Sequence, residues 1–136
     1  MSKNMMLDVL TPERTVCCTE VEFVIARAVD GELGILWDHA PLVVELDIAP
    51  FRYWKDGVEY AVAVNGGFME VKDNRISLLA PTAETAEEID IGRALSAKER
   101  AEKRLAQPMP EIDVARAELA LRRAVTRLKI AEHIRR

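Results

Sequence analysis

The spacing of hydrophobic residues along the chain changes near Thr82 from a strand-like pattern to a helical one. Before Thr82, short runs rich in Val, Ile and aromatic residues alternate with polar positions and end at Gly, Asn or Asp, as strands joined by tight turns do. From Ile89 onward, apolar residues recur every three or four positions, which is typical of amphipathic helices. The pattern predicts an α+β fold, with a β domain over residues 1–84 and a helical domain over residues 85–136.

Turn signals divide the first half into several short runs with β propensity. Asp56-Gly57 is a strong hairpin signal, Gly31-Glu32-Leu33-Gly34 predicts a tight turn, and Pro50 is expected to end the strand before it. Regularly spaced short strands of this kind predict a sandwich or a flattened barrel. The predicted strands cover residues 6–10, 17–28, 42–48, 51–54, 58–64, 68–71 and 76–80.

The second half predicts two helices with clear start and stop signals. Thr85 and Glu88 fit a capping box and Asp90 is a second candidate N-cap, and we expect Asp90 to start the first helix. Pro108 must end that helix because proline cannot continue the hydrogen-bond ladder, and Asp113 can cap the second one. The two stripes predicted to face each other are Ala94, Ala97, Ala101 and Leu105, and Val114, Ala117, Leu121, Ala124, Leu128 and Ala131.

These stripes predict an antiparallel two-helix hairpin of low stability. Alanine side chains remove far less apolar surface from water than leucine side chains do, at about 25 cal/mol per Å². The free energy that holds the two helices together should therefore be small. A weakly held hairpin opens when a partner binds the open form or when a stabilising ligand is lost.

Charge is distributed unevenly along the chain. The net charge of −4 argues against a general nucleic-acid binder. Residues 1–82 hold 7 Lys/Arg and 13 Asp/Glu, a net of −6, whereas residues 83–136 hold 12 and 10, a net of +2. From Ala115 to the end there are 7 basic and 2 acidic residues, so the last helix is expected to bind an acidic surface.

Residues that could carry catalysis or bind a metal are scarce. Cys17 and Cys18 are too few for a metal site and, as neighbours on a strand, poorly placed for a disulfide. His39 and His133 have no evident Asp or Ser partner, so a hydrolytic triad is not expected. No apolar run approaches the ~20 residues that span a bilayer, so we expect no direct membrane insertion. The sequence predicts neither catalytic nor metal-binding residues.

Several strings, in this order along nearly the whole chain, carry a resemblance to a known family. They are Met6-Leu7-Asp8-Val9-Leu10-Thr11-Pro12-Glu13, Gly31-Glu32-Leu33-Gly34-Ile35-Leu36, His39-Ala40-Pro41-Leu42, Val62-Ala63-Val64-Asn65-Gly66-Gly67-Phe68-Met69-Glu70-Val71, Ile89-Asp90-x-x-Arg93-Ala94, Ala101-Glu102-x-x-Leu105 and Arg116-Ala117-x-x-Ala120-Leu121-x-Arg123-Ala124-x-x-Arg127-Leu128. Together they closely resemble the epsilon subunits of bacterial F-type ATP synthases.

The resemblance implies a non-catalytic central-stalk subunit of a proton-translocating complex, at the cytoplasmic face of the bacterial plasma membrane. It implies a flattened antiparallel β-sandwich that docks on the gamma subunit and the membrane c-ring, followed by a helical hairpin. Extended, the hairpin would contact catalytic beta subunits and inhibit ATP hydrolysis; folded, it would permit hydrolysis.

In some members of this family ATP binds between the two helices and stabilises the folded form. The resemblance carries that regulatory ligand, with or without Mg²⁺, onto one set of residues. Arg123 and Arg127 are one helical turn apart, and Arg93 and Arg100 share a face of the other helix, so four guanidinium groups can hold a polyphosphate. The chain has no P-loop motif, so ATP would be a ligand and not a substrate. The implied ATP-binding residues are Glu84, Ile89, Asp90, Arg93, Ala94, Arg100, Arg123 and Arg127.

The resemblance also implies two interfaces and contains two departures. The inhibitory contact with the acidic loop of beta would use Arg116, Arg122, Arg123, Arg127 and Lys129, and rotor docking would use His39, Pro41, Phe68 and Glu70. Trp37-Asp38 stands where the family usually has Pro-Gly, and Ala49 stands where it has Gly. Both departures lie in the β domain and affect the expected docking contacts more than the fold.

Other readings of the same residues remain open. Asp90 and Arg93 could also be only a helix N-cap and an i,i+3 ion pair, with no role in ligand binding. The chain could be a free-standing ATP-sensing module without a rotor role, or an adaptor with a basic arm and no nucleotide. Co-purification with a gamma subunit distinguishes the rotor subunit from both, and ligand-induced stabilisation distinguishes the sensor from the adaptor.

Overall fold

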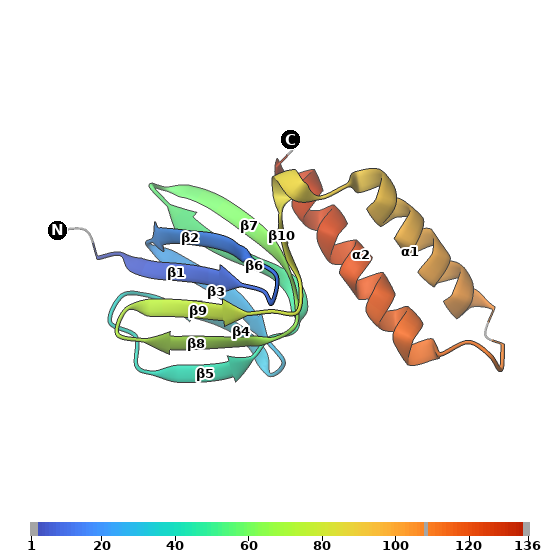
Figure 1. The fold of residues 1–136 in the computed structure, drawn as a ribbon, viewed down its shortest axis with the longest axis horizontal. Helices are drawn as coiled ribbons and strands as arrows, with labels where there is room; N and C mark the ends of the chain where they lie inside the picture. The colour runs from blue at the N-terminus through green and yellow to red at the C-terminus, as the bar shows by residue number, and fades with distance from the viewer. Residues whose placement is uncertain (1–2, 108, 135–136) are drawn as a thin grey trace.

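The structure, a computed structural model, describes residues 3–107 and 109–134. Two five-stranded sheets form a sandwich, and two helices pack beside it (Figure 1). The first sheet has the order β2-β1-β9-β8-β5, and the second has the order β10-β7-β6-β3-β4. In the first sheet the strands are β1 (Met5–Leu10), β2 (Thr15–Val21), β5 (Leu42–Glu45), β8 (Phe68–Lys72) and β9 (Arg75–Leu79); in the second they are β3 (Phe23–Ala28), β4 (Gly31–Ile35), β6 (Ile48–Lys55), β7 (Val58–Asn65) and β10 (Ala83–Thr85).

Alternation along the strands places one face of each sheet in a common core. In β1, Leu7 and Val9 are fully buried, whereas Asp8 points to the outer face and pairs with Arg75 at 2.8 Å. The sandwich core contains, among others, Met5, Leu7, Val9, Val24, Ile35, Phe51, Val62, Met69, Ile76 and Leu78. The predicted α+β class and sandwich are confirmed, with one parallel pair, β1 with β9, among otherwise antiparallel pairings.

Three local predictions were wrong. The run at residues 17–28 is not one strand, because the chain bends at Glu22 and passes from the first sheet to the second. Pro50 does not end a strand but lies inside β6. At this position β6 pairs with β7 alone, because its pairing with β3 is confined to Arg52–Trp54, so no hydrogen bond to β3 is lost through the missing N–H of proline. Residues 31–34 belong to β4, and the turn before them is formed by Val29 and Asp30, after which Gly31 pairs with Ala28 at φ +137°.

The predicted helix starts are confirmed. Thr85 donates its backbone N–H to Glu88 Oε1 at 3.0 Å, which caps the 3₁₀ turn Ala86–Glu88. Asp90 then caps α1 (Ile91–Ala106) by accepting a hydrogen bond from the Arg93 N–H at 3.0 Å. Asp113 caps α2 (Val114–Ile134) in the same way through the Arg116 N–H. Pro108, predicted to end the first helix, lies outside the described residues.

α2 lies between α1 and the second sheet, where it packs on β6 and β7 (Figure 1). The alanine seam predicted between the helices is buried at Ala94 and Ala101 of α1 and at Ala117 and Ala124 of α2. Val114, placed on the same stripe, is exposed at the start of α2. A second small cluster joins the helices to the sheet and consists of Ala61, Ala63, Ala86, Ile89, Ile130 and Ala131.

Candidate functional site

A cavity of about 730 Å³ lies between the helical hairpin and the end of the sandwich. Its walls come from α1, α2, the start of β10, the 3₁₀ turn, and the turn between β1 and β2. The volume is within the range of small-molecule sites, about 300–1,000 Å³. The lining residues are Thr11, Glu13, Arg14, Pro81, Thr82, Ala83, Glu84, Glu88, Asp90, Arg93, Ala94, Ala97, Arg100, Ala120, Arg123 and Arg127.

The structure brings the four predicted arginines of the helices to this one cavity. Arg127 has an acidic partner, Glu84, with Nε 2.5 Å from Oε1. Within residues 3–107 and 109–134, the guanidinium groups of the other three, Arg93, Arg100 and Arg123, make no ion pair or hydrogen bond. Three unpaired cations around one cavity attract an anion, because each gains a charged hydrogen bond when a phosphate or carboxylate arrives.

Small side chains leave space between these arginines. Ala94 and Ala97 of α1 and Ala120 of α2 line the helical wall, and none of them projects beyond Cβ. The alanine stripe therefore has two effects: it lets the helices approach each other and it keeps the cavity open between them.

Two of the predicted ligand residues have structural roles of their own. Asp90 lines the cavity, but its carboxylate caps α1. Ile89 is 3% exposed, packs in the cluster beneath α2 and does not line the cavity. Its side chain therefore anchors the connection that positions α1.

Arg14 lines the cavity from the sandwich side and was missed by sequence reasoning. Its Nη2 lies 2.6 Å from Glu88 Oε2 and donates to the Ala83 carbonyl at 3.4 Å. Burial pushes the pKa of Glu88 upward, but hydrogen bonds from Thr85 and the Arg14 guanidinium outweigh it and hold that pKa below its ordinary value. No local pattern marks Arg14, since residues 14 and 88 meet only through the tertiary fold.

The residues predicted to contact beta do not form one surface in this structure. Arg123 and Arg127 face the cavity, whereas Arg122 and Lys129 line a groove of about 670 Å³ between α2 and β6. Arg122 forms an ion pair with Asp47, and Arg27 Nε lies 4.0 Å from the same carboxylate. Arg116 is exposed in the first turn of α2.

The carboxylate of Asp47 therefore holds α2 on the sandwich. Burial acts to raise the pKa of Asp47, but the Arg122 hydrogen bond, the Ile48 N–H and the charges of Arg122 and Arg27 together lower it. This contact lies on a different face of α2 from the cavity. We refer to the Asp47–Arg122 ion pair as the sandwich latch.

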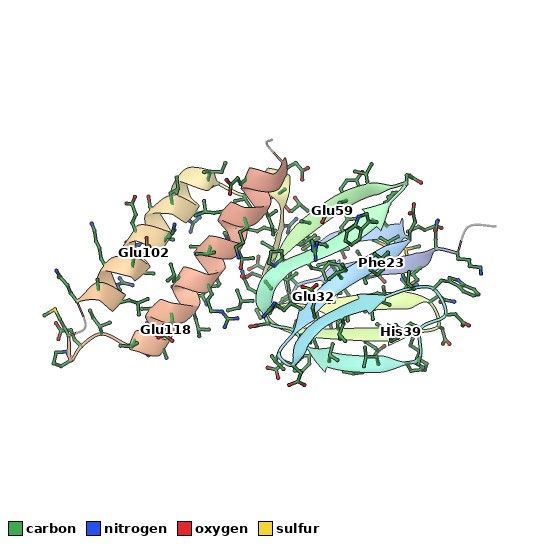
Figure 2. All side chains as sticks on the ribbon, turned by 180° about the vertical axis from the view of Figure 1, so that it is seen from behind. Phe23, Glu32, His39, Glu59, Glu102 and Glu118 are labelled. Carbon is green, nitrogen blue, oxygen red and sulfur yellow. The ribbon has the colours of Figure 1, made fainter. Side chains whose placement is uncertain are left out.

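The predicted rotor-docking residues lie in two places. Phe68 and Glu70 are on the outer face of the first sheet, where Phe68 pairs with Leu79 and Glu70 with Val43. Val43, Phe68 and Leu79 are 66%, 55% and 57% exposed and form an apolar patch. His39 and Pro41 are in the β4–β5 connection, and Figure 2 shows His39 at the end of the sandwich far from the helices.

The altered turn before His39 is accommodated without glycine. Asp38 has φ +64°, a conformation that aspartate tolerates better than most residues. Its N–H donates to Asn74 Oδ1 at 2.6 Å, which fixes the connection to the β8–β9 turn. Trp37 beside it is 42% exposed, with Lys3 Nζ 5.6 Å from its ring centroid.

Within residues 3–107 and 109–134, no group of three or more His, Cys, Asp or Glu side chains is arranged to hold a metal ion. No helix within the same residues is long and apolar enough to cross a membrane.

Family models match almost the whole chain in two parts. Residues 4–86 match the β-sandwich domain of the ATP synthase delta/epsilon chain, and residues 87–132 match its long α-helix domain. The ATP synthase epsilon chain of Desulforamulus reducens is 53% identical over 132 residues, covering 97% of this chain and 100% of that one. The epsilon chain of Bacillus licheniformis is 49% identical over 129 residues, covering 95% and 98%.

Solved structures show the same fold at lower identity. A chain of the mitochondrial ATP synthase of Euglena gracilis superimposes with a TM-score of 0.80 at 23% identity, covering 96% of this chain and 82% of that one. A chain of the Tetrahymena thermophila mitochondrial ATP synthase central stalk and c-ring gives 0.55 at 14% identity, covering 96% and 95%.

Proposed function

Because this chain belongs to the family of ATP synthase epsilon chains, which are non-catalytic subunits of that complex, we propose that it binds ATP as a regulatory ligand in the cavity between its helices and the sandwich. The observation that carries the proposal is the group of three unpaired arginines, Arg93, Arg100 and Arg123, facing one cavity. A triphosphate carries several negative charges, and arginines of both α1 and α2 line the cavity, so one triphosphate can contact both helices.

The cavity is polarised along its length. The helical wall carries the unpaired arginines, and the sandwich end carries the carboxylates of Glu13, Glu84 and Glu88. Phosphates therefore lie toward the helices, and the base lies toward β10, where carboxylate and backbone acceptors suit the amino group of adenine. The chain contains no P-loop sequence, so the nucleotide is held and not hydrolysed.

ATP bound in this way stabilises the folded hairpin. A ligand that bridges α1, α2 and the sandwich binds the folded form and not the extended one, so it shifts the equilibrium by its binding free energy. Without ATP, the helices are held by small alanine side chains and by ion pairs that include the sandwich latch.

The extended form is the inhibitory one in this proposal. Opening the hairpin frees Arg122, Arg123 and Arg127 from their positions against the sandwich. Together with Arg116 and Lys129 they then present a basic helix to the acidic loop of the catalytic beta subunits, which blocks ATP hydrolysis.

The sandwich is proposed to dock on the rotor. The apolar patch of Val43, Phe68 and Leu79 suits the gamma subunit, because exposed apolar patches mark protein interfaces. The connection that carries Trp37, His39 and Pro41 suits the c-ring, at the cytoplasmic face of the bacterial plasma membrane. A free-standing sensor without a rotor role is not favoured, since both domains match the family.

Thermal unfolding of the full chain with and without ATP, at constant salt, tests nucleotide binding. At one hundred times its Kd, ATP should stabilise the protein by about 2.7 kcal/mol, and GTP should have a smaller effect. Arg123→Ala should weaken ATP binding by about 1.5–3 kcal/mol, as expected for a lost charged hydrogen bond. Arg104→Ala, on α1 but away from the cavity, is the matched control. An unchanged midpoint of the unmodified protein in ATP would contradict the proposal.

A further inference from the structure

Arg14 is a fifth arginine at the cavity, and the sandwich carries it (Figure 1 shows the β1–β2 turn at the end of the sandwich that faces the helices). The turn is rigid because Thr11 fixes both backbone groups of Arg14. The Thr11 N–H and hydroxyl donate to the Arg14 carbonyl at 2.9 and 3.2 Å, and the Arg14 N–H donates to Thr11 Oγ1 at 3.2 Å. Pro12 lies within this turn and restricts it further.

The side chain of Arg14 is fixed as well. Its guanidinium lies between Glu88 Oε2, at 2.6 Å, and the Ala83 carbonyl, at 3.4 Å. The Leu10 carbonyl, just before the turn, accepts the Ala80 N–H at 3.0 Å and ties the turn to the chain that leads into β10. A group held this way loses little conformational entropy when a ligand meets it.

The place of Arg14 in the cavity determines whether it can contact the phosphates or the base of a nucleotide. It shares the sandwich end of the cavity with Glu13, Glu84 and Glu88. Two of these carboxylates are already paired, Glu84 with Arg127 and Glu88 with Arg14, so this end has no excess of positive charge, whereas the unpaired arginines of the helical wall attract phosphate. The charge of Arg14 is balanced by Glu88, so Arg14 adds a planar donor surface without creating a second phosphate site.

We propose that Arg14 contacts the base of the bound nucleotide and contributes to its selection. This inference rests on the proposed function, since it assigns a further residue to the same cavity. The guanidinium offers N–H donors to ring nitrogens and a flat face for stacking on a purine. Base selection then depends on the sandwich, and the nucleotide joins both domains directly.

Calorimetric titration of the full chain with ATP and CTP tests this role. CTP keeps the triphosphate but has a smaller ring, so the ratio of the two dissociation constants measures base contact. The unmodified protein should prefer ATP. Arg14→Gln should weaken ATP binding by about tenfold, as for a charged hydrogen bond, and bring the ratio close to one. Arg123→Gln should weaken binding of both nucleotides and leave the ratio unchanged.

Two further variants separate contact from structural support. Glu88→Gln removes the ion pair but keeps the guanidinium, so its ATP affinity should fall less than that of Arg14→Gln. Arg27→Gln alters an arginine–carboxylate pair outside the cavity and should leave the ratio unchanged. An unaltered ratio in Arg14→Gln, or a lack of preference for ATP in the unmodified protein, would overturn the base contact. Absence of any ATP binding by the unmodified protein would instead refute the proposed function.

Discussion

At Gly67 the backbone has φ +100°, and the chain passes so close to β9 that a Cβ would lie 2.0 Å from the Leu79 carbonyl oxygen. A contact of this kind with backbone atoms cannot be relieved by rotating a side chain. Position 67 therefore requires glycine. Only then can the Asn65-Gly66-Gly67 turn lead from β7 in one sheet to β8 in the other.

Gly67→Ala should lower the free energy of unfolding by about 3 kcal/mol or more, because strain and a backbone clash add together. Chemical denaturation monitored by circular dichroism measures the change. Gly57→Ala is the matched control: Gly57 also has positive φ, at +76°, but its Cβ would meet nothing within 4 Å. Its cost should be about 1 kcal/mol. Equal losses in the two variants would contradict the clash.

Among the elements, α2 has the most complex environment. One side contacts α1 through Ala117 and Ala124. Another packs on β6 and β7, with Ile130 in one cluster with Ala61 and Ala63 of β7, and two arginines line the cavity. Because α2 has buried residues on more than one side, its sequence does not show one apolar face opposite one polar face. The helix is nevertheless central to the fold. The separation of α1 and α2 sets both the stability of the hairpin and the width of the cavity.

Ala101→Leu should push the helices apart, because Ala101 is 2% exposed in the seam. Overpacking of this kind costs about 1–3 kcal/mol, and the wider separation should also weaken ATP binding. Thermal unfolding and ATP titration measure the two effects. Ala115→Leu makes the same substitution at an exposed position of α2 and should change neither quantity. A fully retained ATP affinity in Ala101→Leu would show that the helices tolerate the added volume.

In the whole molecule, the hairpin and the sandwich meet at the cavity, at the small apolar cluster that includes Ala63 and Ile130, and at the sandwich latch. The latch lies on the face of α2 away from the cavity and involves Asp47 of the β5–β6 connection. It acts without ATP, so it should set how much of the protein is folded when nucleotide is scarce. Arg122 cannot hold Asp47 and contact another subunit at the same time.

Asp47→Asn should loosen α2 from the sandwich, with a loss of about 1 kcal/mol at pH 7, modest because Arg122 is partly exposed. Since the pKa of Asp47 is lowered in the folded state, the stabilisation is complete above the ordinary carboxyl pKa and is lost as pH falls through the lowered value. The difference between the two proteins in thermal midpoint should therefore shrink as pH falls below about 5. Asp73→Asn, in the β8–β9 turn, is the control, and a pH-independent difference would argue against the latch.

The predictability of the fold differed between its two parts. The helix starts at Asp90 and Asp113 follow from short-range chemistry, in which a carboxylate caps the N–H three residues later. The strand boundaries around Glu22 and Pro50 depend on which sheet each residue joins. Pairing partners of that kind are far away in the sequence, so local propensity cannot assign them.

The sequence by itself determined that a β half precedes two helices, and it determined the caps, the alanine seam and the spacing of the arginines on each helix, because these depend on periodicity and neighbouring residues. It also carried the resemblance that the family matches confirm. Only the tertiary structure decided which arginines have a carboxylate partner, since Glu84, Glu88 and Asp47 lie 43, 74 and 75 residues from Arg127, Arg14 and Arg122. Long-range contacts of this kind form when the chain packs, and they separate the cavity from the latch on α2.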